Sequence, residues 1–279
     1  MLKKYVSLTT LLTLLMLTSS LAWSNLLIYP VRVSFDEQER SATLTLTNTS
    51  QQTNTYRLEW QENKALSEGG YTKLSEEEAK RLPIASPMLR FSPRQVTLKP
   101  GQRQVIKLSL RRPRNLDEGE YRSHILFKAL PPKQTEEQQR ATAMQINMVM
   151  SFAVPITIQQ GRYDASVSLE DATIHYSASK QTGHVSLNLV RQGIHSASGN
   201  ISAYWTPKGG KERLLAKVAD FNAWTELSEI ESKLIWAGNA FTPADGTLRV
   251  VYEGVRDFSD NTYFEETITV RKSDIKKLP

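Results

Sequence analysis

The sequence predicts an all-β protein built from two β-sandwich domains in tandem. Three observations support this fold class. Short segments rich in β-branched and aromatic residues recur along most of the chain, apolar and polar residues alternate within many of them, and Gly, Pro, Asn and Ser separate them. About 255 of the 279 residues follow the first 24, and this length suits two ordinary domains.

The first 24 residues have the pattern of a cleaved signal peptide. Two lysines precede an apolar run over residues 8–17, and small residues at Ala22 and Ser24 have the spacing of a signal-peptidase site. The alternative is an uncleaved membrane anchor, but the run is about half of the roughly 20 residues that span a bilayer. We therefore expect residues 1–24 to be removed and the mature protein to be exported without a membrane span.

Strand patterns fill the expected first domain, residues 25–158. A single helical signal interrupts them, where Ser75 and Glu78 form a capping box ahead of a helix that Pro83 ends. The segment from Lys133 to Arg140 is polar and reads as a surface loop of undefined role. The strand signals lie at residues 26–35, 42–47, 56–60, 88–91, 95–98, 105–110, 120–129 and 144–158.

The expected second domain, residues 159–279, repeats this pattern after an elbow from Gln159 to Arg162. Its segments are short, and turn residues separate them, as in a β-sandwich. The strand signals lie at residues 165–169, 185–190, 200–205, 247–252 and 263–270.

Composition argues against several functions. Cysteine is absent, which excludes thiol catalysis and thiolate metal sites. The formal charge of +6 falls to about +4 without the leader and is spread over segments of mixed sign, which does not favour nucleic acid. The four histidines lack metal-binding spacing, and no nucleophile elbow, phosphate loop or dinucleotide motif occurs. We expect no enzyme activity, cofactor or metal.

Several segments of the first domain, in order, resemble the PapD-like family of periplasmic pilus chaperones. They are Pro-Val-Arg-Val-Ser-Phe at 30–35, Ser-Ala-Thr-Leu-Thr-Leu-Thr-Asn at 41–48, residues 88–100 with a Lys-Pro-Gly turn, Glu-Gly-Glu-Tyr at 118–121 leading to 129, and Leu-Pro-Pro at 130–132. The second domain resembles the family only in its β character and position. The resemblance implies two immunoglobulin-like sandwiches in an L shape with a cleft between them.

The family resemblance also implies a function and partners. Such a protein acts in the periplasm, where it binds pilus or fimbrial subunits and delivers them to an outer-membrane usher. Each subunit lacks a strand, and the chaperone lends one by donor-strand complementation. A donated strand needs apolar side chains at alternate positions to fill the groove of the subunit.

The resemblance places the donor residues in the last strand of the first domain. Met144, Ile146 and Met148 match the alternating donor positions, and Met150 continues the same face. Methionine is flexible, so a Met-rich face suits grooves of different shapes. The alternative is that these side chains belong to the core of the domain itself, because alternation alone does not separate the two roles.

The resemblance also implies a cationic anchor for the carboxylate at the C-terminus of the subunit. Arg32 aligns with the arginine that the family uses, and it lies in an apolar run where a charge is normally paired. The alternative for Arg32 is an ordinary surface arginine. The second cation of the family falls at Ala153, so we expect Arg122 on the neighbouring strand either to replace it or to pair with Glu120.

The family further places an acidic residue at the position of Glu120, in a charge network near the domain junction. The usual basic partner falls at Thr157, so Arg122 is again the expected partner of Glu120.

Two other functions remain open. The chain can be a surface or pilus-associated structural component, although that class usually carries a disulfide. It can also be a glycan-binding sandwich with Trp205, Trp224 and Trp236 as a sugar platform, although paired carboxylates beside an aromatic cleft are not evident. The sequence does not identify the subunit, the pilus system or the oligomeric state.

Overall fold

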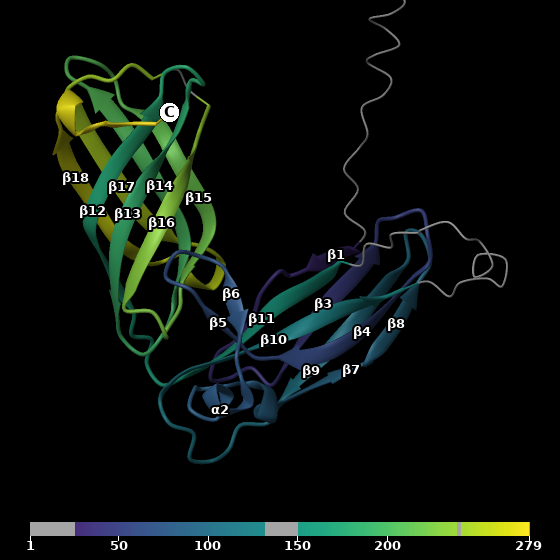
Figure 1. The fold of residues 1–279 in the computed structure, drawn as a ribbon. Coiled ribbons are helices and arrows are strands. Elements are labelled where there is room, and N and C mark those ends of the chain that lie inside the picture. The colour runs from purple at the N-terminus through teal and green to yellow at the C-terminus, as the bar shows by residue number, and fades with distance from the viewer. Residues whose placement is uncertain (1–25, 132–149, 239–240, 279) are drawn as a thin grey trace, which may run out of the picture.

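Two β-rich domains meet at an angle and form the L shape of Figure 1. The computed structural model describes residues 26–131, 150–238 and 241–278. The predicted signal peptide and the loop from Lys133 to Arg140 lie outside these residues. The predicted fold class, two tandem β-sandwiches, is confirmed.

The first domain packs a four-stranded sheet against a five-stranded sheet. Their facing side chains, among them Leu44, Ile106 and Phe127, form one buried core. The four-stranded sheet has the order β1 (Leu26–Tyr29), β3 (Ser41–Asn48), β9 (Arg103–Leu110) and β7 (Leu89–Ser92). The five-stranded sheet has the order β2 (Val33–Phe35), β11 (Ser151–Gln160), β10 (Gly119–Leu130), β4 (Asn54–Gln61) and β8 (Gln95–Leu98).

The strand expected over residues 26–35 is two strands in different sheets. β1 pairs with β3, whereas β2 pairs in parallel with β11, where Val33 lies opposite Ile156. Pro30 follows β1 directly, and proline cannot donate a hydrogen bond to a sheet. The chain therefore crosses from one sheet to the other over residues 30–32.

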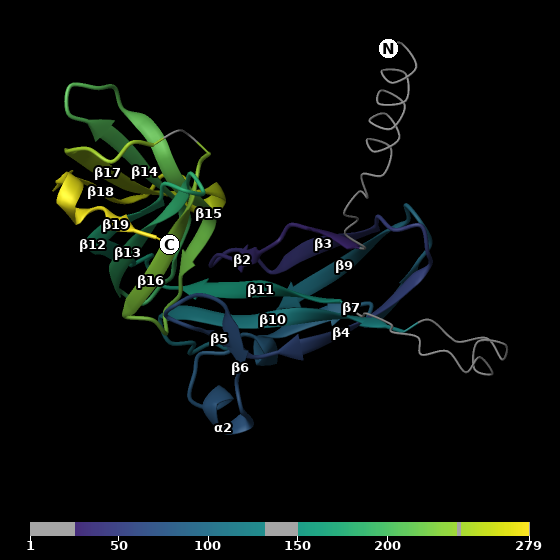
Figure 2. The ribbon, with the colours of Figure 1, turned by 45° about the horizontal axis from the view of Figure 1, so that its top comes forward.

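The outer face of the five-stranded sheet carries a small insertion. Strands β5 (Asn63–Ala65) and β6 (Tyr71–Lys73) form a hairpin, which is followed by helix α2 (Glu76–Ala79) and the 3-10 turn η1 (Ser86–Met88). The predicted capping box is confirmed, because Ser75 caps the backbone of Glu78 and the Glu78 carboxylate accepts from the Ser75 backbone. Figure 2 shows the hairpin at the corner of the L.

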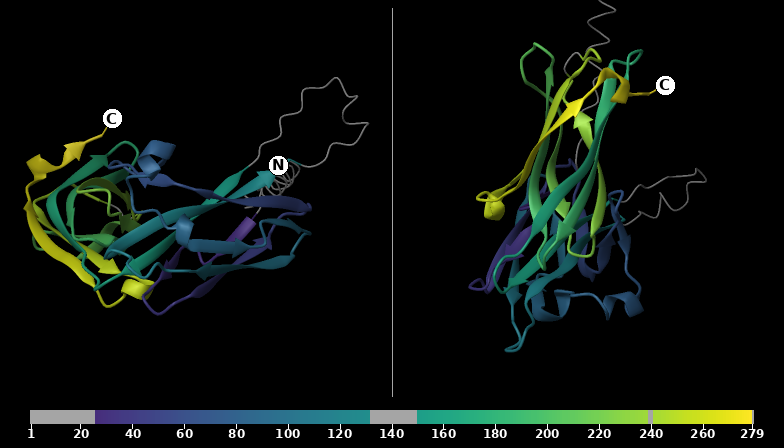
Figure 3. Two further views of the ribbon diagram at one scale, coloured as in Figure 1. Left: turned by 90° about the horizontal axis from the view of Figure 1, so that it is seen from below. Right: turned by 90° about the vertical axis from the view of Figure 1, so that its left-hand side faces the viewer.

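The second domain is one eight-stranded sheet folded into two layers. β18 (Thr262–Val270), β17 (Gly246–Gly254), β14 (Ala197–Pro207) and β15 (Arg213–Ala223) form one layer, and β16 (Glu229–Trp236), β13 (Thr182–Gln192), β12 (Ser166–Ser177) and β19 (Lys276–Lys277) form the other. The layers are joined by two residue pairs between β15 and β16. Trp205 and Tyr252 are fully buried between them, and Figure 3 shows the domain from two further sides.

Two short 3-10 turns complete this domain, η2 (Arg256–Phe258) and η3 (Lys272–Asp274). In the described part of the chain, none of the helices has the length and apolar character needed to cross a membrane.

Candidate functional site

Arg32 lies where the two domains meet, just before β2. Its guanidinium group donates to the Asn222 carboxamide oxygen at 2.6 Å and to the Ser196 hydroxyl at 3.4 Å. It also lies 5.0 Å from the ring centre of Trp224 and 5.2 Å from that of Phe258. All of these partners are neutral, so they hold the cation without cancelling its charge.

Arg122, on β10, lies over the same indole ring, with its guanidinium carbon 4.1 Å from the centre of Trp224. Its charge is paired with the Glu226 carboxylate of the second domain. Glu226 also accepts from the Ala65 backbone at 2.7 Å, and Arg122 also donates to the Asn63 carbonyl at 3.2 Å. The structure thus brings the two predicted arginines together on one tryptophan, Arg32 from the residue before β2 and Arg122 from β10.

Glu120 connects the domains without pairing to Arg122. It is 3% exposed, and its carboxylate accepts from the Ser196 hydroxyl at 2.6 Å and from the Ser196 backbone at 3.2 Å. Its own backbone N–H donates to the Ile194 carbonyl. The expected pairing of Glu120 with Arg122 is wrong, because the Arg122 guanidinium turns toward Trp224 and meets Glu226 instead.

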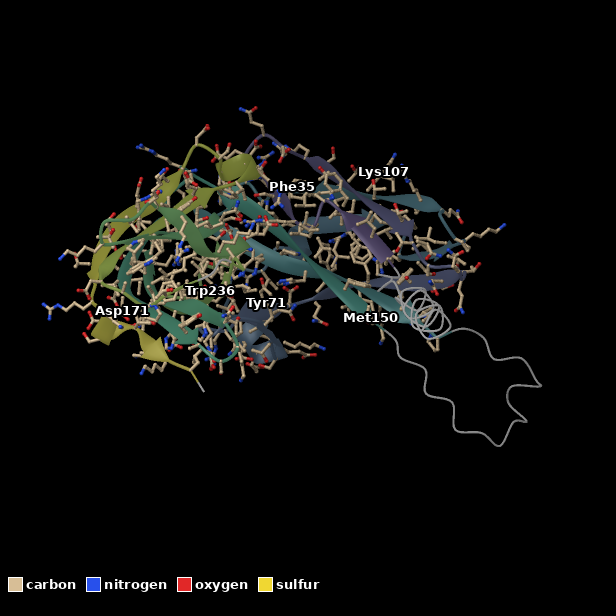
Figure 4. The ribbon with its side chains drawn as sticks, turned by 90° about the horizontal axis from the view of Figure 1, so that it is seen from above. Phe35, Tyr71, Lys107, Met150, Asp171 and Trp236 are labelled. Carbon is tan, nitrogen blue, oxygen red and sulfur yellow. The ribbon has the colours of Figure 1, made fainter. Side chains whose placement is uncertain are left out.

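The β5–β6 hairpin ties the outer face of the first domain to the second. The Trp224 indole N–H donates to the Tyr71 hydroxyl at 2.9 Å, and Figure 4 shows Tyr71 between the domains. The Ser67 carbonyl accepts from the Glu231 backbone at 2.8 Å. The ring of Tyr71 also packs on His124, at 5.4 Å between ring centres. Burial, helped by the charge of Arg122, lowers the pKa of His124 to about 4.

One buried arginine organises the second-domain side of the junction. The Arg191 guanidinium donates to five backbone carbonyls, at distances of 2.9–3.3 Å. These acceptors belong to Gln192, Gly193, His195, Thr225 and Leu227. The two loops that supply Ser196, Trp224 and Glu226 are therefore fixed to a single cation.

The predicted donor residues lie largely outside the described chain. Met144, Ile146 and Met148 fall outside it, whereas Met150 directly precedes β11 and is 44% exposed. Figure 4 shows Met150 at the end of the first domain far from the second. Phe152, two residues further along the strand, packs against the core. Side chains on the same face of β11 as Met150 therefore pack on the core of the first domain, whereas Met150 itself, just before the strand, is exposed.

The edge of β11 is open beyond β2. β2 pairs with Ile156–Ile158 of β11, and no other described strand pairs with residues 151–155 on that side. Ala153, at the position of the missing family lysine, is exposed and lies opposite Leu126. Thr157, at the position of the missing basic partner, is buried and donates to the Ser34 hydroxyl at 3.1 Å.

Two histidines that are distant in sequence are cross-strand neighbours. His175 and His184 stack at 4.4 Å between ring centres on β12 and β13. Across the described ranges, no group of three or more His, Cys, Asp or Glu side chains is placed to hold a metal.

The second-domain residues of the junction were not found by sequence reasoning. Asn222, Trp224, Glu226 and Phe258 lie at strand ends and in turns, where no periodic pattern marks them. Trp224, proposed above as part of a sugar platform, is 2% exposed, and Trp205 is buried in the second core. The structure therefore does not bring the three tryptophans together on a surface.

Comparison with known proteins identifies the family of the first domain. Residues 25–158 match the model of the PapD N-terminal domain, described as a pili and flagellar-assembly chaperone. Among curated proteins, none matches this sequence significantly.

Solved pilus chaperones show a similar outline at low identity. The class 5 fimbriae chaperone CfaA is 14% identical, with a TM-score of 0.43, over 91% of this chain and 100% of its own. The CupB2 chaperone of Pseudomonas aeruginosa is 14% identical, with a TM-score of 0.42, over 88% and 100%. A chain from a Salmonella enterica complex of the SafA pilin with the SafB chaperone is 12% identical, with a TM-score of 0.43, over 90% of this chain and 99% of its own.

The predicted resemblance is confirmed, and it rests on a match that spans the whole sandwich from β1 to β11. The first domain of this chain, residues 25–158, therefore belongs to the PapD N-terminal domain family of pilus-assembly chaperones.

Proposed function

We propose that this protein is a periplasmic chaperone that completes a pilus subunit with a donated strand and delivers it to an outer-membrane usher. The observation that carries the proposal is the open edge of β11, which has an exposed apolar side chain, Met150, at one end and Arg32 at the other. The proposed role needs no catalysis, cofactor or metal.

The backbone of the open edge supplies the first part of the interaction. Residues 151–155 have no strand on the side away from β10 in the described chain, so their outward N–H and C=O groups are available to a subunit strand. Met150, followed outward by the predicted donor positions Met148, Ile146 and Met144, supplies alternate side chains for the subunit groove.

The position of β2 sets the end of the added strand. β2 occupies the edge from Ile156 onward, so a strand added beside residues 151–155 must stop where β2 begins, next to Arg32. A subunit strand whose C-terminus lies there runs parallel to β11. Its terminal carboxylate then meets the Arg32 guanidinium, whose present partners are neutral.

Co-purification from the periplasm tests this function. The mature protein is expressed with pilus subunits of the same organism, as wild type and as the variants Arg32→Met, Met150→Glu and Arg249→Met. We expect the wild type and Arg249→Met to carry the subunit in a one-to-one complex, because Arg249 lies in a surface ion-pair cluster of the second domain.

Arg32→Met and Met150→Glu are expected to lose most of the bound subunit. The proposal is refuted if the wild type carries no subunit, or if both variants carry as much as the wild type. Binding of the wild type to a glycan array, with no subunit bound, would instead favour the glycan-binding alternative.

A further inference from the structure

We infer that the second domain supplies its own carboxylate, Glu226, to Arg122, so that a subunit carboxylate meets one cation in this cleft, Arg32. In this arrangement Arg122 and Glu226 form an internal strut between the domains. The binding part of this inference rests on the proposed function, whereas the strut itself does not.

The Arg122–Glu226 pair is largely shielded from solvent and is held on both sides. The two side chains are 9% and 15% exposed. Backbone groups of the β5 strand add a second contact to each, since Ala65 donates to Glu226 and Asn63 accepts from Arg122. A subunit carboxylate that took Arg122 would leave Glu226 buried without its counter-ion, and such a charge is strongly unfavourable.

The charges around the strut already balance. Besides Arg122 and Glu226, the buried set contains Glu120 and Arg191, and the charges of Glu120 and Glu226 both act on the Arg191 guanidinium. Two cations and two anions make this group neutral before any subunit binds.

A cavity of about 160 Å³ lies beside the strut. Arg122 lines it, and two of its guanidinium nitrogens have no hydrogen-bond partner among the described residues. Glu120 and Glu226 line the same cavity, however. A carboxylate that entered it would therefore meet two negative charges for one positive charge, which disfavours this route to Arg122.

Arg32 differs from Arg122 in its partners. It is half-buried, it donates to an amide and a hydroxyl, and its Nε has no hydrogen-bond partner in the described chain. Of the two arginines that contact Trp224, Arg32 is therefore the one whose described partners are all neutral. The guanidinium carbons of Arg32 and Arg122 lie 5.0 and 4.1 Å from the centre of the Trp224 ring. The two arginines thus share this ring but not a counter-ion.

Four variants separate these roles: Arg122→Met, Glu226→Met, the double variant with both changes, and Arg32→Met. Each is measured for its thermal unfolding midpoint and for its affinity for the pilus subunit that co-purifies with the wild type, which is diluted from denaturant into a titration of the chaperone. Methionine keeps an apolar stem against Trp224 while it removes the charge.

We expect both single strut variants to lower the midpoint, and the double variant to recover most of the loss. The double variant should bind the subunit within about threefold of the wild type, whereas Arg32→Met should weaken binding about tenfold or more.

Two results would overturn the inference. One is a double variant that binds as weakly as Arg32→Met while its midpoint is near that of the wild type. The other is a double variant that is no more stable than the single variants. Failure of the wild type to bind any subunit would refute the proposed function, and the midpoints would still test the strut.

Discussion

Replacing Arg191 with methionine tests how the junction loops are held. The guanidinium is buried, and it donates to five carbonyls in two loops that local secondary structure does not hold together. Burial lowers the pKa of Arg191, while Glu120 and Glu226 act against this shift. The side chain nevertheless stays charged, because arginine remains protonated in proteins.

The magnitude follows from these hydrogen bonds. Four of the five are 2.9–3.0 Å long, and the fifth, to Gln192, is 3.3 Å. Hydrogen bonds to charged groups contribute about 1.5–3 kcal/mol each. Water can reach part of the exposed loops, and the variant no longer buries a cation, so we expect a net loss of about 4 kcal/mol in the free energy of unfolding.

Urea unfolding followed by tryptophan fluorescence measures this loss, because Trp205, Trp224 and Trp236 all lie in the second domain. Arg249→Met is the control, since Arg249 makes two ion pairs but lies on the surface, where such pairs contribute little. A loss below about 1 kcal/mol for Arg191→Met would refute the reasoning. So would equal losses in the two variants.

Two further changes give sharp expectations. His124 has a pKa of about 4 when folded and about 6.5 when unfolded, so its stabilising contribution is complete above pH 6.5 and falls as the pH drops toward 4. By pH 5 the free energy of unfolding has fallen by about 2 kcal/mol. In His124→Phe, the urea unfolding midpoint should change less between pH 6.5 and pH 4 than in the wild type. An equal change in the two proteins would contradict the lowered pKa of His124. Gly193 has φ of +96° and an added Cβ would lie 2.5 Å from the Asp164 carbonyl oxygen. Gly193→Ala should therefore lower the unfolding midpoint more than Gly209→Ala, because at Gly209 φ is +72° but the space around an added Cβ is open. Equal effects of the two variants would show that the backbone at Asp164 moves away from the new Cβ at little cost.

The first domain could be predicted from sequence because its signals are local. The alternation from Ala42 to Leu46 defines β3, and the capping box at Ser75 defines the start of α2. In the second domain β15 and β16 were missed. β15 has an irregular burial pattern, and in β16 the polar Ser232 is buried while Ile235 is exposed. Alternation of apolar and polar residues does not reveal a strand in which a polar side chain points to the core or an apolar one points to solvent.

The candidate site could be predicted only on the side of the first domain. Glu120 and Arg122 belong to β10, and Arg32 directly precedes β2. The places of these two strands in the sheet can be expected, so the proximity of the three residues was foreseeable. Their partners were not, because Arg32 and Asn222 are 190 residues apart and meet only through the packing of two domains. The patterns in a single sequence do not show how two domains are oriented and packed against each other.

The junction is a fixed scaffold rather than a simple hinge. The hairpin bonds of Tyr71 and Ala65, the Glu120 contact with Ser196 and the Arg122–Glu226 pair all cross it from different elements. A bending motion would have to break these bonds together, so they hold the geometry around Arg32. Preorganisation of this kind reduces the ordering cost of binding. Under the proposed function, this leaves the free energy of binding to the donated strand and to the carboxylate at Arg32.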